Sequence, residues 1–391
     1  MIKKISIFIL FSLSFLYGCS KTGPYPDDGI QKKSIADFRN LKDGTTDWYK
    51  LAGEVISIAD EEYGVLYLMD DTGYICVYGL ASEKDEANGD FPELGIKAGD
   101  RITIVAQKRT RNGNVETDKA YFENRRAGTY PGIKADKALS AYVELPATSG
   151  KDGLVYVCHY DGHGKRNFSA YFDTEKRLSS WVCYPYCSSD KNDPRPDSYA
   201  YDPLIGSKYQ ANLKKSFQKR TFNGEEFIRG HMLPNASRGG RCQLDSFLSI
   251  NIMPQSSLLN TGIWSKLEAG EREWVRKCDT LYVVVGTDST QSRYQVEDNS
   301  SPPKKITVPN AIYRAVLAYD KKSGTYKGMA TYFENRKSSN RDFVKTLPNT
   351  VLMSIDKLEE KLGIDLFVNL PDDVEKAVEA ADPAREPFWW N

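Results

Sequence analysis

The sequence predicts an α+β protein with two domains, a small all-β domain followed by a larger domain of mixed strands and helices. The chain has 391 residues, which is more than one ordinary core holds at about 100–200 residues per domain. Short β-rich runs with turns between them fill residues 48–127, and longer strands mixed with helical patterns fill residues 150–391. Hydrophobic residues at 40% and charged residues at 27% are typical of a globular protein with sizeable cores.

Residues 1–19 have the pattern of an export signal. Two lysines precede an apolar run from Ile5 to Tyr17 that is too short for a stable membrane span. The letters "LYGC" that end it resemble the lipobox of bacterial lipoproteins, in which the signal is cut before a cysteine that is then lipidated. This resemblance implies that Cys19 is the first mature residue and that the protein is an exported cell-envelope lipoprotein, facing the periplasm or the surface. The alternative is an ordinary cleavable signal with a spare cysteine.

Six further cysteines remain after Cys19. An even number in an exported chain permits disulfides, but six cysteines allow about 15 complete pairings, and the sequence does not choose among them. Cys183 and Cys187 are the closest pair, and their spacing, with no histidine or second pair nearby, does not favour zinc. Buried free thiols are the remaining interpretation.

The all-β domain is predicted to follow a tether. Residues 20–47 are rich in Gly, Pro, Asp and Lys, which is typical of a tether that lifts a folded body off the lipid. Residues 48–127 contain five β-rich runs and a helix-sized insertion before Asp100. This architecture resembles an OB-like barrel. Such barrels hold oligonucleotides or oligosaccharides, but they also serve as spacers and interaction modules, so the ligand stays unknown.

The larger domain begins after a loop-rich linker, residues 128–149. Its expected strands are "LVYVCHY", "SSWVCYPY", "SFLSINIMP", "TLYVVVGT" and "AIYRAVLAY". Its expected helices span residues 258–276 and 355–362, and Gly363 closes the second.

The segment "EEFIRGHMLPNASRGGRC" contains His231, one of only three histidines in the chain. Arg229-Gly230-His231 alone is typical of a turn glycine beside a histidine that bonds within a core. The segment that follows changes this interpretation. Successive residues of a helix are rotated by about 100°. Asn260, Glu268 and Arg272 therefore share one side of the helix that is expected over residues 258–276.

At this point residues 150–391 resemble the non-specific DNA/RNA endonucleases of the ββα-metal (His-Me finger) class, which includes secreted bacterial nucleases and mitochondrial endonuclease G. The family signature is D-R-G-H before a proline, followed by N-x-x-P-Q, L-N, a Trp and L-E-x-x-x-R. The corresponding segments are "IRGHMLP", "NIMPQ", "LLNTGIW" and "LEAGER". Several motifs in the family order make the match specific.

The resemblance implies a role for each matched residue. His231 corresponds to the general base, because imidazole titrates close to working pH. Asn260 corresponds to the single direct ligand of Mg²⁺, for which Mn²⁺ can substitute, and Glu268 to a partner of the metal's water molecules. Arg229 and Arg272 correspond to phosphate-binding residues. Two further residues, Asn251 and Gln255, are expected to shape the site.

Three points lie outside the direct match. The family's Asp before Arg is Ile228 here, so a charge that helps to hold Arg229 is missing. Arg195 is a candidate for a further phosphate-binding residue, and the alternative is a solvent-exposed loop arginine. Basic residues also outnumber acidic ones around the signature, which predicts a local patch for phosphate within a chain of net charge zero. Its members are Lys208, Lys214, Lys215, Lys219, Arg220, Arg229, Arg238 and Arg241.

We therefore expect a lipid-anchored, metal-dependent endonuclease that hydrolyses DNA and RNA with little sequence preference. Its partners would be its nucleic-acid substrates and a membrane. The resemblance leaves the oligomeric state open, a homodimer included. The alternative is an envelope lipoprotein in which the change at Ile228 has impaired catalysis, and which binds nucleic acid or glycan through its barrel.

Overall fold

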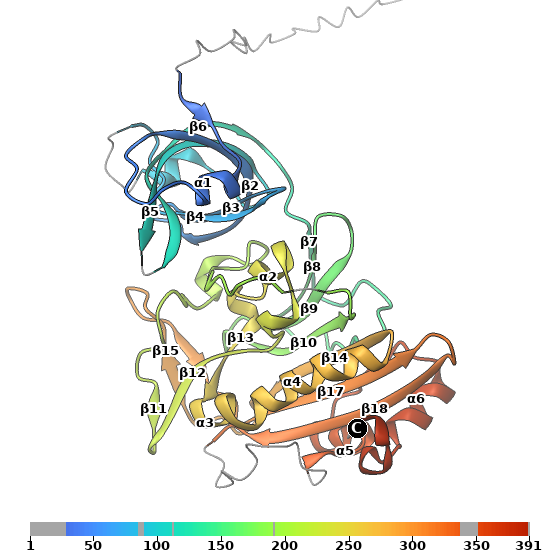
Figure 1. Ribbon diagram of the computed structural model, residues 1–391. Coiled ribbons are helices and arrows are strands. Elements are labelled where there is room, and N and C mark those ends of the chain that lie inside the picture. The colour runs from blue at the N-terminus through green and yellow to red at the C-terminus, as the bar shows by residue number, and fades with distance from the viewer. Residues whose placement is uncertain (1–28, 85–89, 112, 191, 337–350, 390–391) are drawn as a thin grey trace, which may run out of the picture.

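The computed structural model describes residues 29–84, 90–111, 113–190, 192–336 and 351–389. Two bodies follow one another along the chain, a β-barrel and a larger body built around an open sheet (Figure 1). The export signal and Cys19 lie outside the described residues. None of the helices in the described ranges combines the length and the hydrophobicity that a membrane-crossing helix needs.

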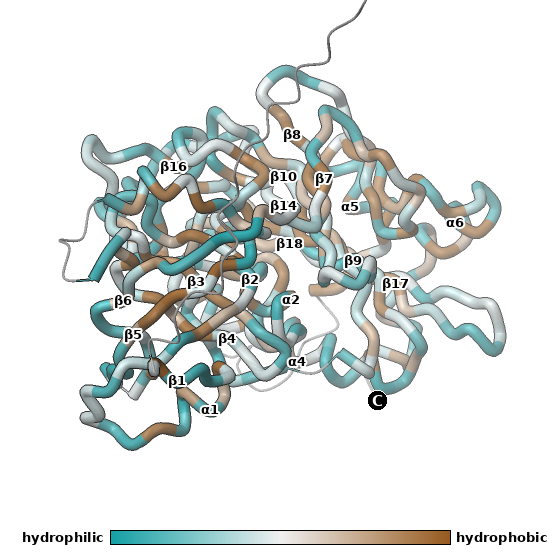
Figure 2. Tube along the Cα trace, turned by 90° about the horizontal axis from the view of Figure 1, so that it is seen from above, coloured by the Kyte–Doolittle hydropathy of each residue, from teal (hydrophilic) through white to brown (hydrophobic). Residues whose placement is uncertain are grey.

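Five strands close the barrel. They are β2 (Tyr49–Asp60), β3 (Val65–Asp70), β4 (Gly73–Val77), β5 (Arg101–Arg111) and β6 (Asn114–Arg126). The strand order is β2-β3-β4-β6-β5, and pairing of β2 with β5 completes the circle. Alternate side chains point inward and fill the barrel, among them Leu66, Leu68, Ile75, Val77 and Ile104. The hydrophobic tracts on β3 and β5 are visible in Figure 2.

The barrel begins earlier in the chain than the sequence indicates. Residues 20–47 were expected to form a tether, but β1 (Gln31–Lys32) pairs with β2, and α1 (Ile35–Arg39) packs against the barrel. Ile35 and Phe38 lie three residues apart on one side of α1 and are fully buried in the barrel core. The expected helix-sized insertion is described only as a single turn of 3₁₀ helix, η1 (Phe91–Leu94).

An antiparallel sheet of seven strands forms the frame of the second body. Its order is β18-β17-β14-β10-β9-β8-β7. The strands are β7 (Gly132–Ala135), β8 (Leu154–Tyr160), β9 (Arg166–Asp173), β10 (Leu178–Tyr186), β14 (Thr280–Asp288), β17 (Ala311–Asp320) and β18 (Thr325–Glu334). Because β7 pairs with β8, part of the predicted linker, residues 128–149, belongs to this sheet.

A second group of strands lies beside one face of the sheet. Here β12 (Glu225–His231) pairs with β11 (Thr221–Phe222) and with β13 (Ile252–Ser256). The predicted strand "SFLSINIMP" is shorter than expected, because η4 (Ser249–Asn251) occupies its middle. Four short elements complete this region: α2 (Gly240–Asp245), η2 (Ser207–Tyr209), η3 (Asn235–Ser237) and the hairpin of β15 (Gln295–Glu297) with β16 (Lys305–Thr307).

The predicted helix over residues 258–276 is present but is not one regular helix. It consists of α3 (Ser257–Leu259), a π-helical segment η5 (Asn260–Trp264), α4 (Ser265–Trp274) and η6 (Val275–Lys277). Gly262 departs from helical geometry inside the π segment. Ile263, Leu267 and Trp274 of this region are all buried.

Helices cover both faces of the seven-stranded sheet (Figure 1). Val283 and Val285 point to the side where Leu267 of α4 packs. Val284, between them, points to the opposite side, which is covered by α5 (Ile355–Leu362) and α6 (Asp372–Glu379). The chain then forms η9 (Pro383–Arg385) and η10 (Pro387–Trp389). As predicted, Gly363 closes α5, in the left-handed conformation with φ 65°.

The barrel contacts the second body through the outer face of β3 and β4. Tyr67, Met69, Tyr74 and Cys76 point away from the barrel interior and pack into the large hydrophobic cluster of the second body. Arg241 of α2 forms a salt bridge to Glu54 at 2.5 Å, and Lys214 pairs with Asp60. A continuous apolar contact with ion pairs at its edges therefore joins the two bodies.

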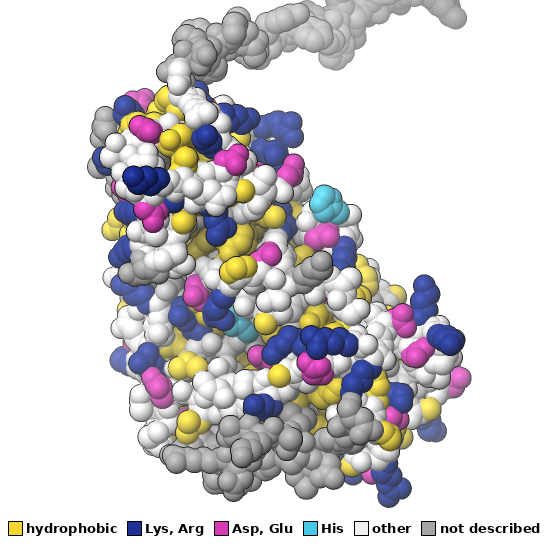
Figure 3. Space-filling model, viewed as in Figure 1, with side chains coloured by type: hydrophobic (Ala, Val, Ile, Leu, Met, Phe, Trp, Pro, Cys, Tyr) yellow, Lys and Arg dark blue, Asp and Glu magenta, His cyan; other side chains and the backbone are white. Residues whose placement is uncertain are grey.

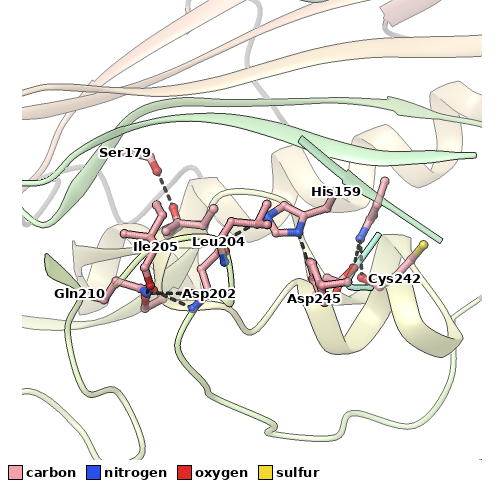
Figure 4. A network of polar contacts seen from close by, with 12 residues as sticks. His159, Ser179, Asp202, Leu204, Ile205, Gln210, Cys242 and Asp245 are labelled. Carbon is pink, nitrogen blue, oxygen red and sulfur yellow. Dashed lines mark hydrogen bonds and ion pairs between the residues drawn. The ribbon is translucent and has the colours of Figure 1, made fainter. Parts of the chain in front are cut away.

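A buried polar network lies beside this contact (Figure 4). His159 Nε2 lies 2.8 Å from Asp202 Oδ2, and both side chains are fully buried. The hydroxyl of Tyr130 lies 3.0 Å from His159 Nδ1 and donates to Asp245 Oδ1 at 3.1 Å. Burial lowers the pKa of His159, but Asp202 outweighs it, and the net direction is upward. His159 therefore has the structural role that its position on a strand suggests.

The six cysteines of the described chain are all free. Cys158 and Cys183 are buried, and burial raises the pKa of the Cys183 thiol to about 12. Of the interpretations that the sequence leaves open, free thiols are the one that the structure shows.

A buried ion pair fixes α4 to the sheet. Arg314 of β17 donates from Nη1 to Glu271 Oε1 at 2.7 Å, and neither side chain is exposed. Tyr184 of β10 donates to the other oxygen of Glu271 at 3.0 Å. The guanidinium also lies 4.4 Å from the centre of the Trp264 ring. Two strands and the helix thus meet at one carboxylate.

We predict that Glu271→Ala destabilises the protein by about 3–5 kcal/mol, because it leaves the Arg314 charge buried without its partner. Glu273→Ala on the same helix is the matched control, since Glu273 pairs with Arg276 at the surface and should cost at most about 1 kcal/mol. Urea unfolding followed by tryptophan fluorescence measures both. Equal losses for the two variants would contradict the role assigned to the buried pair.

Candidate active site

The β12–β13 hairpin positions His231. Its backbone pairs with Ile252 across the hairpin, and its side chain is only 8% exposed. Phe247 packs edge-on against the imidazole with ring centres 4.8 Å apart, and the Tyr199 ring centre lies 6.0 Å away. The imidazole therefore has one orientation, enforced by packing.

The electrostatic environment of His231 keeps its imidazole neutral. Burial lowers the pKa of His231 to about 3, and the positive charges of Arg195 and Arg229 act in the same direction. The Nε2 atom is buried, and no described residue forms a hydrogen bond with it. A neutral imidazole is the form whose unprotonated ring nitrogen can accept a proton.

Arg229 is held without an acidic neighbour. Its Nη1 donates to the carbonyl of Leu213 at 2.6 Å, and its guanidinium stacks over Tyr199 at 3.9 Å from the ring centre. Ile228, in the position where the family signature has Asp, pairs with Gln255 in the hairpin. A backbone carbonyl and an aromatic ring therefore supply the support that the missing carboxylate would give.

Arg195 lies on an exposed loop but is fixed at several points. Its Nε donates to Asp197 at 2.7 Å, its Nη2 donates to the Tyr199 hydroxyl at 3.1 Å, and its guanidinium lies 5.0 Å from the Phe247 ring centre. Tyr199 thus lies between Arg195 and Arg229. The Arg195 side chain is still 49% exposed, so Arg195 is a surface arginine of a loop that is held in place by these contacts.

The amide of Asn260 is oriented by Gln255. Asn260 Nδ2 donates to Gln255 Oε1 at 2.6 Å, and no described residue donates to Asn260 Oδ1. Gln255 is fully buried because Gly230 leaves it room: a Cβ at Gly230 would lie 2.7 Å from the Gln255 Cβ. A free amide oxygen in a fixed orientation fits the oxygen ligand that Mg²⁺ prefers.

Asn251 shapes the loop after His231. Its Oδ1 accepts from the backbone N–H of Leu233 at 2.8 Å, and its Nδ2 donates to the carbonyl of Ser246 at 2.7 Å. The side chain is fully buried. These two hydrogen bonds join Asn251 to the backbone at both ends of the segment between Leu233 and Ser246.

Glu268 and Arg272 lie one turn apart on α4. Burial raises the pKa of Glu268 to about 7; Arg314 opposes this shift, the Glu271 carboxylate adds to it, and Arg272 and Arg195 oppose it. The positive charge of Arg195 therefore lowers the pKa of both Glu268 and His231. No described residue forms a hydrogen bond or salt bridge with the guanidinium of Arg272, so it is free to bind an anion.

Sequence reasoning missed Tyr199 and Phe247. Both are buried and both contact His231; Tyr199 also contacts Arg195 and Arg229, and Phe247 contacts Arg195. The signal for Tyr199 is its position four residues after Arg195 within a polar loop. Phe247 carries no comparable signal, because a phenylalanine between helix and strand is typical of any core.

The predicted basic patch is mostly neutralised. Arg238 and Arg241 are buried, at 4% and 6% exposed, and Arg241 pairs with Glu54 of the barrel. Three others form salt bridges, namely Lys214 with Asp60, Lys219 with Glu297 and Arg220 with Glu226. Basic and acidic side chains are interspersed over the face seen in Figure 3. The expectation of one continuous patch was wrong, because sequence proximity does not reveal partners from distant segments.

Residues 153–373, more than half of the chain, match the family model for DNA/RNA non-specific endonuclease. The chain belongs to this family and is a hydrolytic nuclease. It is 28% identical over 214 residues to a nuclease of Serratia marcescens, an alignment that covers 52% of this chain and 74% of that protein. A nuclease of Nostoc sp. is 25% identical over 227 residues, covering 55% and 76%.

Two further similarities concern a human protein of which about half is aligned and a solved structure. The human mitochondrial nuclease EXOG is 27% identical over 213 residues, covering 50% of this chain and 52% of that protein. A crystal structure of an EndoG/EndoGI complex is similar at a TM-score of 0.42 and 17% identity, covering 53% and 85%.

We predict that His231 stays neutral at every pH above about 4, because protonation would add a buried charge beside two arginines. Nuclear magnetic resonance titration of the imidazole measures this. Unfolding restores the ordinary pKa near 6.5, so the contribution of His231 to stability is complete above that value and is lost as pH falls towards 3.

Arg195→Ala should raise the pKa of His231, whereas Lys208→Ala, which removes a cation stacked on Tyr209, should not. An imidazole that titrates near pH 6.5 in the folded protein would contradict the prediction.

Proposed function

We propose that the protein is a metal-dependent endonuclease that cleaves DNA and RNA with His231 as general base and Asn260 as metal ligand. The observation that carries this proposal is the neutral imidazole of His231, with a free Nε2, between Arg195 and Arg229. A base must be unprotonated to accept a proton, and a phosphodiester needs cations around it. The burial and the arginines thus serve both needs.

The proton transfer follows from the position of His231. Its free nitrogen accepts a proton from the attacking water, and the imidazolium that forms lies close to the negative phosphate rather than in an empty apolar site. Substrate binding would therefore raise the pKa of His231 from its value in the free protein, because a phosphate partly offsets Arg195 and Arg229.

The arginines are placed to bind the phosphate. Arg229 presents the part of its guanidinium that Leu213 does not occupy, and Arg272 has no described partner of its own. A planar guanidinium donates two parallel hydrogen bonds to phosphate oxygens. These bonds would orient the phosphorus for attack and oppose the charge that grows on its oxygens.

The amide oxygen of Asn260 and the carboxylate of Glu268 would hold a Mg²⁺ ion and its water molecules, respectively. The ion supplies Lewis-acid stabilisation of the phosphate and of the leaving oxygen. Glu268 gains its negative charge as pH rises through about 7, the value to which burial raises its pKa. Because Asn260 donates its Nδ2 to Gln255, the Oδ1 atom of Asn260 is directed away from Gln255.

The arrangement of elements supports the ββα-metal assignment. The hairpin β12–β13 is followed directly by the helix from α3 to α4, and the residues named above lie on these elements. The strand order of the barrel, with β4 parallel to β6, supports an OB-type barrel. In OB folds the ligand face comprises the strands that correspond to β3 and β4 here, and these pack on the nuclease body. This contact favours catalysis over the alternative of ligand binding through the barrel.

We further propose that Cys19 carries a lipid that holds the mature protein on a membrane surface. The support is the sequence "LYGC" after a short apolar run. A lipidated N-terminal residue would precede the barrel, since β1 begins at Gln31.

The test of the nuclease proposal is cleavage of plasmid DNA and of RNA by the full chain as Mg²⁺ is titrated, with and without chelator. His231→Ala should lower turnover by about 10²–10⁴-fold. Asn260→Ala should abolish Mg²⁺-dependent turnover, because it removes the only proposed direct ligand. Glu268→Ala should cost about 10–100-fold and recover in part at high Mg²⁺.

His163→Ala is the matched control, because His163 lies on an exposed turn between β8 and β9 and should leave turnover unchanged. Two results would overturn the assignment. One is a His231→Ala variant within twofold of the unmodified chain. The other is the reverse order of the metal variants, with Glu268→Ala inactive and Asn260→Ala nearly normal.

For the anchor, Cys19→Ser should move the expressed protein from the membrane fraction to the soluble fraction, because the proposed lipid has no other attachment point. Cell fractionation measures this, and mass analysis of the mature N-terminus detects the lipid. Cys76→Ser, a change within the barrel, is the control. Membrane association that survives Cys19→Ser would point to a protein partner instead.

A further inference from the structure

Three carboxylates meet on the side of the sheet that faces away from the candidate active site. Asp356 and Glu359 lie on α5, and Glu379 is the last residue of α6. One oxygen from each carboxylate lies within 4.8 Å of the corresponding oxygens of the other two. Because α4 and His231 belong to the opposite face, this cluster is separate from the nuclease site.

Glu379 is the unusual member of the cluster. Its side chain is 5% exposed, and its Oε1 atom is buried without a hydrogen-bond partner among the described residues. A buried carboxylate oxygen without a donor is costly and requires an explanation. Glu379 contributes one carboxylate oxygen to the group formed with Asp356 and Glu359, so a cation at that group would be a partner for this side chain.

The neighbouring residues increase the negative charge. Glu375 and Asp365 also act on Glu379, and a second buried oxygen, Oε1 of Glu375, has no described partner. No described Lys or Arg forms a salt bridge with any of these five carboxylates. Lys361, on the same helix as Glu359, stacks instead over Tyr332 at 4.5 Å from the ring centre.

The protonation behaviour agrees with this geometry. Burial, followed by the nearby carboxylates Glu359 and Glu375, raises the pKa of Glu379 to about 9. Burial also raises the pKa of Glu359 to about 7, against the backbone N–H of Leu366 that donates to its Oε1 at 2.7 Å. Without a cation, only bound protons would reduce the electrostatic repulsion among these carboxylates.

We propose that Asp356, Glu359 and Glu379 bind a calcium ion that ties α5 to α6. Calcium takes about six to eight oxygen ligands in flexible geometry, and carboxylates together with water molecules supply them. Magnesium fits less well, because it usually keeps several water molecules and takes one or two carboxylates. Zinc prefers nitrogen and sulfur ligands, and the cluster contains neither.

The ion would stabilise the cover of the sheet. Leu358 of α5 and Val378 of α6 pack into the same hydrophobic cluster as Val284 of the central strand β14. Each helix has only eight residues, so its stability depends on packing rather than on its own hydrogen bonds. Asp356 and Glu359 lie within residues 153–373, whereas Glu379 lies beyond them, so the matched part of the family model does not contain the complete cluster.

The test is the melting temperature of the metal-free full chain as Ca²⁺ is added. The experiment is done in an Asn260→Ala background, which removes the proposed metal ligand of the nuclease site. Metal binding at that site then does not contribute to the measured shift. At a Ca²⁺ concentration about 100 times the dissociation constant, the melting temperature should rise by about 3–4 °C. Isothermal calorimetry should count one ion per chain.

Two variants in the cluster and one control make the result specific. Glu379→Gln and Asp356→Asn should each abolish the Ca²⁺-dependent rise, and Asp356 is exposed, so its substitution leaves packing intact. Glu360→Gln, an exposed neighbour on α5, should keep the full rise. Two results would overturn the proposal. One is a melting temperature of the unmodified protein that does not change with Ca²⁺. The other is a rise in both cluster variants as large as that in the unmodified protein.

Discussion

The contact between Glu271 and Arg314 is the constraint on which the geometry of the nuclease site depends. Both side chains are fully buried, so each charge is tolerated only at the position where it meets the other. Arg314 belongs to a central strand and Glu271 to α4, and therefore the pair fixes the rotation of α4 about its axis. Glu268 and Arg272 flank Glu271 in the chain and inherit that rotation.

The barrel acts on the same site from a different direction. Tyr74 of β4 donates to the carbonyl of Pro194 at 3.5 Å, next to Arg195 in the chain. Asp193, two residues before Arg195, accepts from the backbone N–H of Gly240 at 2.7 Å. The loop that carries Arg195 is thus confined between the barrel and α2. The barrel therefore helps to hold the loop on which Arg195 lies, through the outer face of β4.

The parts of the site that could be predicted are those that lie within one contiguous pattern. His231, Asn260, Glu268 and Arg272 occupy a signature, and the end of α5 at Gly363 follows from local backbone chemistry. The basic patch could not be predicted, because the partners of Arg241 and Lys214 lie in the barrel, far away in the sequence. The start of the barrel was missed for a related reason. Ile35 and Phe38 stand in a polar segment, and only tertiary packing shows that they are buried.

Burial shifts protonation in opposite senses on the two faces of one sheet. At His231 burial and two arginines lower the pKa of the imidazole and favour its neutral form. At Glu379 burial and neighbouring carboxylates favour the neutral acid, so the cluster binds protons unless a cation replaces them. In both places desolvation disfavours the charged form of the side chain. The sign of the neighbouring charges decides whether an anion or a cation would stabilise that charged form. An anion restores the charged form of His231, and a cation restores that of Glu379. The alternation of side chains along β14 separates these two environments by the thickness of a single sheet.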